Sequence, residues 1–512
     1  MGCNNVFTSW DSTKFSSFLA FRLNLHCFRP AIVSNPLVTG SAPLSSLLTS
    51  DFWGVPLSHT GSHKSYRPLT SLSFRLDWIL APGSPSQFHL TNLLLHALVS
   101  HLFHTFLLSL LPSAPTSLTA ALLFAAHPIH TEAVAGVVGR AELLSAVFFL
   151  LTLITHRRHG WSLGTSLLAA AATLAKEPGL TVLGVCFVLE LVGLRGANKR
   201  SLLKICLSLV AILSLRAAAL GGSLPSFSKA DNPASHSSSF LTRALTFLHL
   251  PAQNFWLLLC PSKLSYDWSM NAVPLVTSLT DPRSTVALIF YAVLASLSLP
   301  LLPLLKILPP FFCQKQTFPP RPTQAGSLAV GPSLALALAL TILPFLPATN
   351  LLFYVGFVLA ERILYVPSLG FCLLVAMGVQ KLSQLKPRIA NLGFLLLLTT
   401  GSLRTLTRNA DWSSEEQLFS SGVLTNPAKS LSNLGTVLHN QGKTDLAEAA
   451  FRQALTHRAN MADTHYNLGI LLQGEGRLAE ATVAYTAAIR FALPSTSTKL
   501  SVYQDIWPSN QC

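Results

Sequence analysis

The sequence predicts an all-α protein in which a polytopic helical membrane bundle is followed by a short α-solenoid of helical-hairpin repeats. Hydrophobic residues make up 50% of the 512 positions and charged residues only 11%. Soluble proteins of this length carry about 25% charged residues. About ten apolar stretches lie between Phe88 and Thr407, and a 34-residue repeat follows them.

The apolar stretches are long enough, or nearly long enough, to cross a bilayer. A hydrocarbon core of about 30 Å needs about 20 residues of helix. Because several stretches are shorter, we expect their helices to extend into the flanking residues. They are Phe88–Leu111, Ser117–Ala126, Glu142–Thr155, Leu163–Leu174, Leu180–Leu194, Leu202–Leu220, Val286–Leu305, Ser327–Leu346, Leu351–Val379 and Leu392–Leu403.

Basic residues follow every second stretch, which predicts a topology. Cytosolic loops of membrane proteins are enriched in Lys and Arg. We therefore place the opposite segments, 127–141, 175–179, 221–285, 347–350 and everything after Thr407, on the other side. The cytosolic cations are Arg157, Arg158, Arg195, Lys199, Arg200, Lys204, Lys306, Lys315, Arg321, Lys381, Lys386 and Arg388.

The formal net charge of +15 belongs to the membrane part of the chain. From Asp411 onward the chain has seven Lys and Arg residues and nine Asp and Glu residues, a local charge of 7 − 9 = −2. A nucleic-acid-binding protein gathers its cations on one soluble face instead. The charge distribution therefore excludes nucleic acid as a partner.

The chain divides into four predicted regions. A divergent segment, 1–50, contains no span, and the membrane domain covers 51–407. Its long loop, 221–285, contains a short apolar stretch bounded by Pro251 and Pro261, which we expect to form a juxtamembrane helix in the bilayer interface. A partial repeat array at 408–494 precedes an irregular tail at 495–512.

The repeat array is of the tetratricopeptide (TPR) type. Small and aromatic residues recur 34 positions apart, where the two helices of each hairpin must pack closely. Two repeats bury little surface, so residues 411–427 are expected to supply a partial helix before them. The matching positions are Asn433-Leu434-Gly435 and Asn467-Leu468-Gly469, Gly442 and Gly476, Ala447 and Ala481, Phe451 and Tyr485, and Ala454 and Ala488.

Ionisable residues cluster at the predicted span ends of the non-cytosolic side. Such residues are costly in a membrane and are functional candidates by default. A cavity lined by Arg, Lys and His suits a phosphate-bearing substrate, because these donors neutralise phosphate oxygens. The candidates are His63, Lys64, Arg67, His89, His127, His130, Glu132, Arg140, Glu142, Lys176, Glu177, Glu361, Arg362 and Tyr365.

Each group also has a structural interpretation. His127, His130 and Glu132 have a spacing that is typical of metal ligands, but neither a cysteine nor a second cluster of ligands completes a coordination shell. Arg140 and Lys176 are also suited to anchor their helices at the interface, and Glu361-Arg362 to form an internal ion pair. His96, His101 and His104 lie at helical spacings, which favours packing and interhelical hydrogen bonds.

Several long motifs occur between residues 51 and 368. They are 51–54 (DFWG), 62–69 (SHKSYRPL), Phe88-His89, the run from His127 to Arg140, Lys176-Glu177, 264–269 (LSYDWS) and 361–368 (ERILYVPS). Together they resemble the transmembrane and tetratricopeptide repeat-containing (TMTC) O-mannosyltransferase family. The resemblance covers about 51–490, and over 239–270 it is strongest to the family's second paralogue.

The resemblance implies a GT-C fold in the endoplasmic reticulum membrane, with the active site and the repeats in the lumen. It implies transfer of mannose from dolichyl phosphate mannose to Ser or Thr of cadherin-type domains, with no cofactor besides this donor and an open question of metal. Arg140, Lys176 and Arg362 would hold the phosphate, with His63, Lys64 and Arg67 as alternatives. Glu132, Glu177 and Glu361 would be the catalytic and orienting carboxylates. His89, His127, His130 and Tyr365 would line the substrate site.

The sequence also departs from the family. Members begin with a further span and a luminal loop that bears adjacent acidic residues, and neither occurs in 1–50. The repeat array is also short. We therefore expect a shortened or inactive form of the enzyme. The rival hypothesis is a non-enzymatic membrane scaffold that binds protein partners through its luminal repeats.

Overall fold

The computed structural model describes residues 29–111, 113–192, 199–222, 227–301 and 330–492. It separates the chain into two compact parts. The membrane domain comprises Met1–Leu264 and Pro274–Ser413, and the repeat domain comprises Ser265–Val273 and Ser414–Cys512. The tail predicted at 495–512, most of the segment 1–50 and the loop cations Arg195, Lys306, Lys315 and Arg321 lie outside the described residues.

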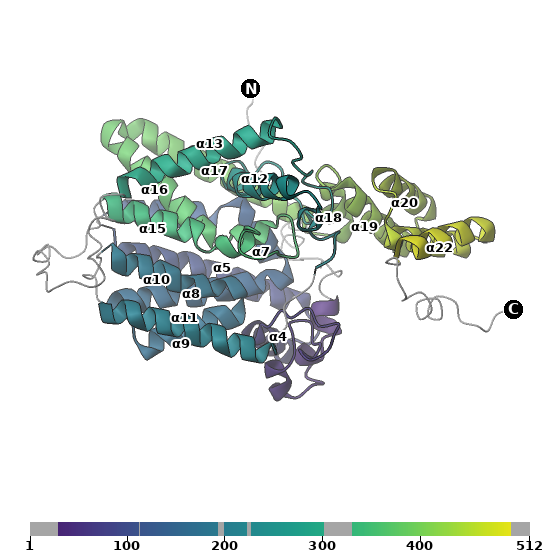
Figure 1. Ribbon diagram of the computed structural model, residues 1–512, viewed down its shortest axis with the longest axis horizontal. Coiled ribbons are helices and arrows are strands. Elements are labelled where there is room, and N and C mark those ends of the chain that lie inside the picture. The colour runs from purple at the N-terminus through teal and green to yellow at the C-terminus, as the bar shows by residue number, and fades with distance from the viewer. Residues whose placement is uncertain (1–28, 112, 193–198, 223–226, 302–329, 493–512) are drawn as a thin grey trace, which may run out of the picture. The chain divides into compact units, whose positions relative to one another are not determined.

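The membrane domain is a bundle of near-parallel helices (Figure 1). Every apolar stretch of the sequence contributes a helix, so the all-α bundle is confirmed. Within the described residues, seven helices are long and apolar enough to cross a membrane. The bundle helices are α5 (Pro85–Leu108), α6 (Ala114–Ala125), α8 (Arg140–His159), α9 (Leu163–Ala175), α10 (Val182–Leu191), α11 (Lys199–Ala219), α13 (Pro282–Ser298), α15 (Val330–Ile342), α16 (Pro367–Leu385) and α17 (Pro387–Asp411).

Helix α8 lies at the centre of this bundle. Of its membrane-crossing window 72% is buried in the protein, whereas the value is 6% for α11, α13 and α17. The outer helices therefore present apolar side chains such as Leu203, Leu288 and Leu396 outward. This pattern is what a lipid environment requires, because lipid tails are as apolar as a protein core.

The stretch predicted at 351–379 is helical only in its second half. Residues 351–360 are irregular, a short 3-10 helix η9 (Glu361–Leu364) follows, and α16 begins at Pro367. Proline is favoured in the first turn of a helix, where its missing N–H has no partner to lose. Asn350 directly precedes the irregular half. Its side-chain oxygen accepts hydrogen bonds from the Val355 amide and from the Asn232 side chain.

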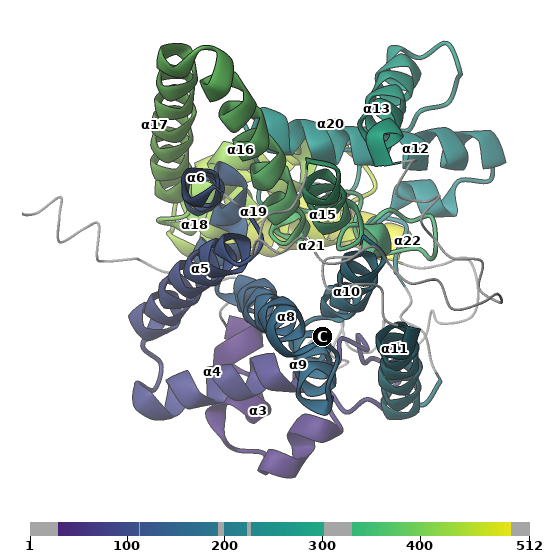
Figure 2. The same ribbon diagram turned by 90° about the vertical axis from the view of Figure 1, so that its left-hand side faces the viewer.

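The long loop contains a helix across the bundle direction. Helix α12 (Phe240–Leu259) appears end-on in Figure 1 and lengthwise in Figure 2, so it runs across the bundle helices. Trp256 and Leu259 are exposed on it. This arrangement fits the expected interfacial helix. The helix is longer than predicted, because Ser239 caps its start and Pro251 is tolerated inside it.

The segment before the bundle folds around Asp51. It contains η1 (Arg29–Val33), α3 (Pro36–Thr39), η2 (Leu44–Leu48) and α4 (Pro68–Leu80). The buried Asp51 carboxylate accepts hydrogen bonds from four groups, the Trp53, Val55 and His63 amides and the Ser62 hydroxyl. The loop that leads to Arg67 is thereby held in a fixed conformation.

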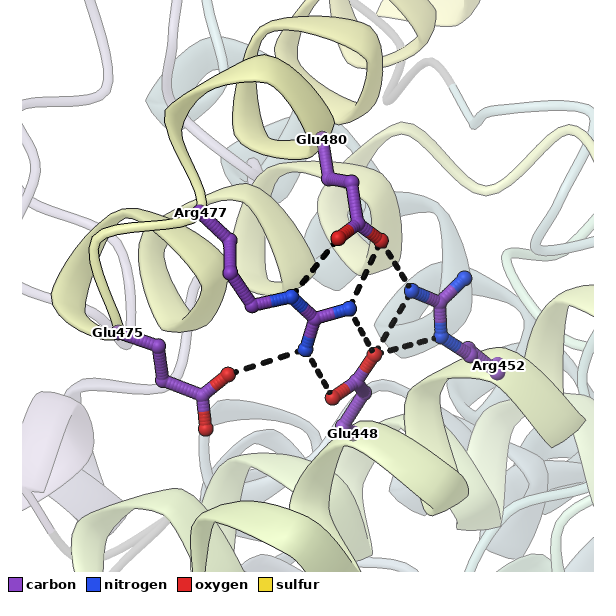
Figure 3. Close-up of polar contacts among 5 residues, drawn as sticks. All are labelled: Glu448, Arg452, Glu475, Arg477 and Glu480. Carbon is purple, nitrogen blue, oxygen red and sulfur yellow. Dashed lines mark hydrogen bonds and ion pairs between the residues drawn. The ribbon is translucent and has the colours of Figure 1, made fainter.

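The repeat domain contains two helical hairpins, which confirms the predicted repeats. They are preceded by α18 (Glu415–Gly422) and consist of α19 (Pro427–Asn440) with α20 (Thr444–His457) and α21 (Ala462–Gly474) with α22 (Leu478–Ala492). Gly442 and Gly476 both adopt positive φ in the turn of their hairpin, as their 34-residue spacing requires. Glu448 and Glu480 bind Arg452 and Arg477, and Arg477 also reaches Glu475, which ties the hairpins together (Figure 3).

Helices α15 and α16 approach closely at Gly370. A Cβ atom at this position would overlap the Ala337 carbonyl oxygen and the Thr341 hydroxyl, whereas one at Gly378 in the same helix would meet nothing within 4 Å. We expect Gly370→Ala to cost about 1–3 kcal/mol by overpacking. The thermal unfolding midpoint of the purified protein should fall, and Gly378→Ala should leave it nearly unchanged. Equal midpoints for the two variants would contradict this packing.

Candidate functional site

The polar motifs meet at one end of the bundle. The turn η3 (Pro128–His130) and the short helix α7 (Thr131–Ala135) contact η9, and α17 contacts η3 and α7. The Thr405 hydroxyl on α17 donates to the Ala126 carbonyl at 2.8 Å. The chain that leads toward the repeats therefore leaves the membrane domain at the end that carries these motifs.

Glu132 and Arg362 form the first ion pair of the site. One Glu132 oxygen pairs with the Arg362 guanidinium, and the other accepts from the Arg362 amide at 2.7 Å. The carboxylate is buried, whereas 38% of the Arg362 side chain is exposed. Glu132 therefore fixes both the backbone and the side chain of the most accessible cation among these ion pairs.

Glu177 binds two arginines from different segments. Arg67 Nε lies 3.0 Å from Glu177 Oε2, and an Arg216 nitrogen lies 3.0 Å from Oε1. Burial alone would raise the Glu177 pKa, but the two guanidiniums reverse the effect and lower it to about 2. Sequence reasoning missed Arg216, because it lies inside an apolar run. A cation near the end of a span was the available indication.

Lys176 links these two pairs electrostatically. Its ammonium pairs with Glu142 on α8 and is buried. Burial lowers the Lys176 pKa, Glu142 opposes this effect, and the nearby Arg67 and Arg362 lower it further. The four cations therefore form one cluster, which we call the cation cluster: Arg67, Lys176, Arg216 and Arg362.

Arg140 is not accessible to a ligand. Its side chain is 0% exposed and pairs with Asp77 at 2.5 Å. The guanidinium also donates to Asn92 Oδ1 and to the Ser73 and Phe88 carbonyls, and it lies over the Phe74 ring at 4.6 Å. All these partners come from α4 and α5. The structure thus gives Arg140 a packing role, and phosphate binding, which we expected of it, has no geometric support.

The histidines of the site form an aromatic cluster instead of a cationic one. The rings of His96, His130 and Tyr365 surround Phe124, with centroids 4.3–5.8 Å away. His96 Nδ1 bonds the Tyr365 hydroxyl at 2.7 Å and Nε2 bonds the Ala125 carbonyl at 3.2 Å. Because a carbonyl only accepts, Nε2 carries the hydrogen and Nδ1 of the neutral ring accepts from tyrosine.

The other two histidines of this turn are hydrogen-bonded to neighbouring elements. His127 Nε2 donates to the Leu258 carbonyl on α12 at 3.0 Å, and His130 Nε2 lies 2.8 Å from the Ser368 hydroxyl. Burial lowers the pKa of His127 to about 4 and that of His130 well below its usual value. Both rings are therefore neutral at pH 7 and add no positive charge for a phosphate.

The remaining candidates lie in or around the site as follows. Glu361 is wholly buried, and His89 is buried on α5. His63 is exposed and bonds Ser65, while the Lys64 ammonium binds the Leu57 carbonyl. The interhelical role expected of the α5 histidines is confirmed for His96 and for His104, which bonds Ser117 across to α6, whereas His101 is exposed.

Comparison with known proteins finds relatives of one kind along most of the chain. The family model described as "Protein O-mannosyl-transferase TMTC, DUF1736" matches residues 221–295, and a tetratricopeptide repeat model matches 428–460. Mouse "Protein O-mannosyl-transferase TMTC2" is 42% identical over 85% of this chain and 60% of its own length. The chain is therefore similar to TMTC proteins over most of its length. No solved structure matches it.

Other TMTC proteins match nearly as well. Drosophila "Protein O-mannosyl-transferase Tmtc1" is 40% identical over 86% of this chain and 60% of its own, and human "Protein O-mannosyl-transferase TMTC3" is 38% identical over 90% and 52%. The chain thus spans about 60% of the length of its first relatives. Among the described residues of this chain, no three His, Cys, Asp or Glu side chains are grouped to hold a metal ion.

Removal of the Arg140 side chain should destabilise the membrane bundle. Arg140→Ala leaves the Asp77 carboxylate buried without its cation, which costs about 3–5 kcal/mol. The thermal unfolding midpoint of the purified protein should fall sharply. Arg388→Ala, at an exposed position, is the control and should leave the midpoint unchanged. If both variants melt alike, the Arg140 pair does not support the bundle.

The Glu177 ion pairs should withstand mild acid. A carboxylate whose pKa falls from 4.5 to about 2 on folding stabilises the protein above pH 4.5 and loses this contribution as the pH falls toward 2. The difference in thermal midpoint between the wild type and Glu177→Gln should therefore stay constant from about pH 8 to 5 and shrink below that range. A difference that changes between pH 8 and 6 would mean that another group controls it.

Proposed function

We propose that this chain transfers mannose from dolichyl phosphate mannose to Ser or Thr hydroxyls of cadherin-type protein domains. The observation that carries the proposal is the cation cluster. Three paired carboxylates, Glu132, Glu142 and Glu177, face its four cations, so these seven groups retain one positive charge. A lipid phosphate at this end of the bundle would satisfy that charge.

The reaction needs an anion site for the leaving group. The acceptor oxygen bonds to C1 of mannose while the bond from C1 to the phosphate oxygen breaks, and dolichyl phosphate departs with the electron pair. Cations held in place before the reaction stabilise this developing charge without reorganisation. Arg362 and Arg67, 38% and 22% exposed, are the cations best placed to meet the phosphate.

The acceptor proton passes to the departing phosphate, whose dianion is a base, because the paired carboxylates are poorly suited to accept it. A general base works best with a pKa near the working pH, and that of Glu177 is about 2. Glu132 is held by both the backbone and the side chain of Arg362. In this proposal Glu132, Glu142 and Glu177 orient the cations, and Glu361 supports η9 from the interior.

The proposed location is the endoplasmic reticulum membrane, with the site and the repeats on the luminal side. Two observations support it. The cation cluster lies at the bundle end away from the predicted cytosolic cations, and α17 delivers the chain to that same end. The repeats would then bind the acceptor or other proteins from the compartment in which transfer occurs.

A non-enzymatic scaffold is the second candidate. The ion pairing of Glu132, Glu142 and Glu177 favours it, because each of these three carboxylates already binds a cation. In this case the same ion pairs serve only to hold the bundle together. Partner binding through the repeats would be its whole function.

The deciding experiment measures transfer of labelled mannose from dolichyl phosphate mannose to a cadherin-type domain, in microsomes of cells that lack family activity. Arg362→Ala and Arg67→Ala should each lower transfer about 100-fold or more, the usual cost of losing a charge-stabilising group. Arg388→Ala, on the predicted cytosolic side, should transfer like the wild type.

Expression must be equal in all samples. If Arg362→Ala transfers mannose at the wild-type rate, the cation cluster is not part of the donor site. Wild-type protein that binds partners through its repeats but transfers no mannose would establish the scaffold.

A further inference from the structure

The segment 265–273 belongs to the repeat domain although it lies far away in the sequence. It connects α12 to α13, two helices of the membrane domain, yet it forms a compact part together with the residues from Ser414 onward. The chain therefore passes between the two domains three times, at 264–265, 273–274 and 413–414. A repeat array attached only by its end would cross once.

Tyr266 provides the main contact of this segment. Its ring lies 5.0 Å from the Phe419 ring on α18, and its hydroxyl accepts from the Asn433 amide on α19 at 3.0 Å. A Cβ atom on Gly422 would lie 2.8 Å from the Tyr266 ring. The glycine at the end of α18 thus leaves the space that the tyrosine occupies.

Asn426 provides the second contact. Its side-chain oxygen caps α19, and its amide nitrogen donates to the Ser269 carbonyl at 3.1 Å and approaches Asp267 Oδ1 at 3.4 Å. The residue is 2% exposed. One buried amide therefore serves both the helix start and the segment, and its loss would leave buried polar groups without partners.

We propose that residues 265–273 are the N-terminal cap of the repeat domain and that this cap keeps the repeats folded to bind a protein acceptor. Terminal repeats of a solenoid need a cap, because their outer face has no neighbour. Helix α18 alone is a half-hairpin, and the segment completes it. The role in acceptor presentation rests on the proposed function, whereas the capping role does not.

The cap is connected to the candidate site through the covalent chain. The end of α12 precedes the segment directly and is held by His127 at Leu258 and by Arg404 at Pro261 and Ser262. His127 begins the turn that leads to Glu132.

Hydrogen exchange of the full-length protein in lipid nanodiscs tests the capping role. Tyr266→Ala and Asn433→Ala should each accelerate amide exchange in α18 and the first turns of α19 about tenfold, as expected for a lost hydrogen bond or ring contact. Asn467→Ala is the matched control. This asparagine occupies the same position one repeat later, but its amide donates to Thr436 within the repeats, so exchange in α18 should not change.

A double variant distinguishes the cap from general damage to the repeats. Gly422→Ala introduces the Cβ that collides with the Tyr266 ring, and it also comes within 2.6 Å of the Ser430 hydroxyl. The variants are therefore made in a Ser430→Ala background, which removes the hydroxyl collision. If the segment is the cap, Gly422→Ala combined with Tyr266→Ala should then exchange like Tyr266→Ala in that background. Additive acceleration, or equal effects of Asn433→Ala and Asn467→Ala on α18, would overturn the proposal.

The transferase assay tests acceptor presentation. Tyr266→Ala should lower transfer to a folded cadherin-type domain about tenfold and leave transfer to a short Ser/Thr peptide unchanged, because the peptide does not need the repeats. Equal losses for both acceptors would overturn the presentation role. If the wild type transfers no mannose at all, the proposed function fails, and the exchange measurements still decide whether the segment is the cap.

Discussion

Charge burial at one end of an apolar bundle is the constraint on which the membrane domain depends. A charged side chain among membrane helices is tolerated only when it is paired or faces water. Here each pair also joins segments distant in the sequence: Arg140 on α8 with Asp77 on α4, Lys176 after α9 with Glu142, and Arg362 of η9 with Glu132 of α7. The polar groups therefore hold this end of the bundle together, as apolar packing does along the helices.

The degree of exposure separates the cations that hold the fold from those that can meet a ligand. Arg140 is wholly buried and its guanidinium is surrounded by protein acceptors and two aromatic rings. Arg362 is held by a buried carboxylate, and 38% of its side chain is exposed. Both are arginines in long shared motifs, so their sequence context is similar. The difference arises from Asp77 and Asn92, which only the folded bundle brings to Arg140.

The sequence predicts those features that depend on local pattern. Apolar length identifies the bundle helices, the 34-residue period identifies the hairpins, and the alternation of charge places Glu132, Lys176 and Arg362 on one side. Pairing partners are not local, so they could not be predicted: Arg67 and Glu177 are 110 residues apart. The start of α16 at Pro367 could have been predicted, since proline favours the first turn, but the apolar run from Leu351 obscured it.

Residues 265–273 are predicted to be part of a loop because their partners, too, are distant in the sequence. Nothing in the motif from Leu264 to Ser269 has a helical or strand period, and its partners Phe419, Asn426 and Asn433 lie about 150 residues away. The hairpins, in contrast, pack through a contact that recurs after 34 residues, Gly435 against Phe451 and Gly469 against Tyr485, and the ion pairs from Glu448 to Arg477 join them (Figure 3). A periodic contact can be found from the sequence because it recurs. A contact that occurs once, such as that of Tyr266 with Phe419, is found only in the structure.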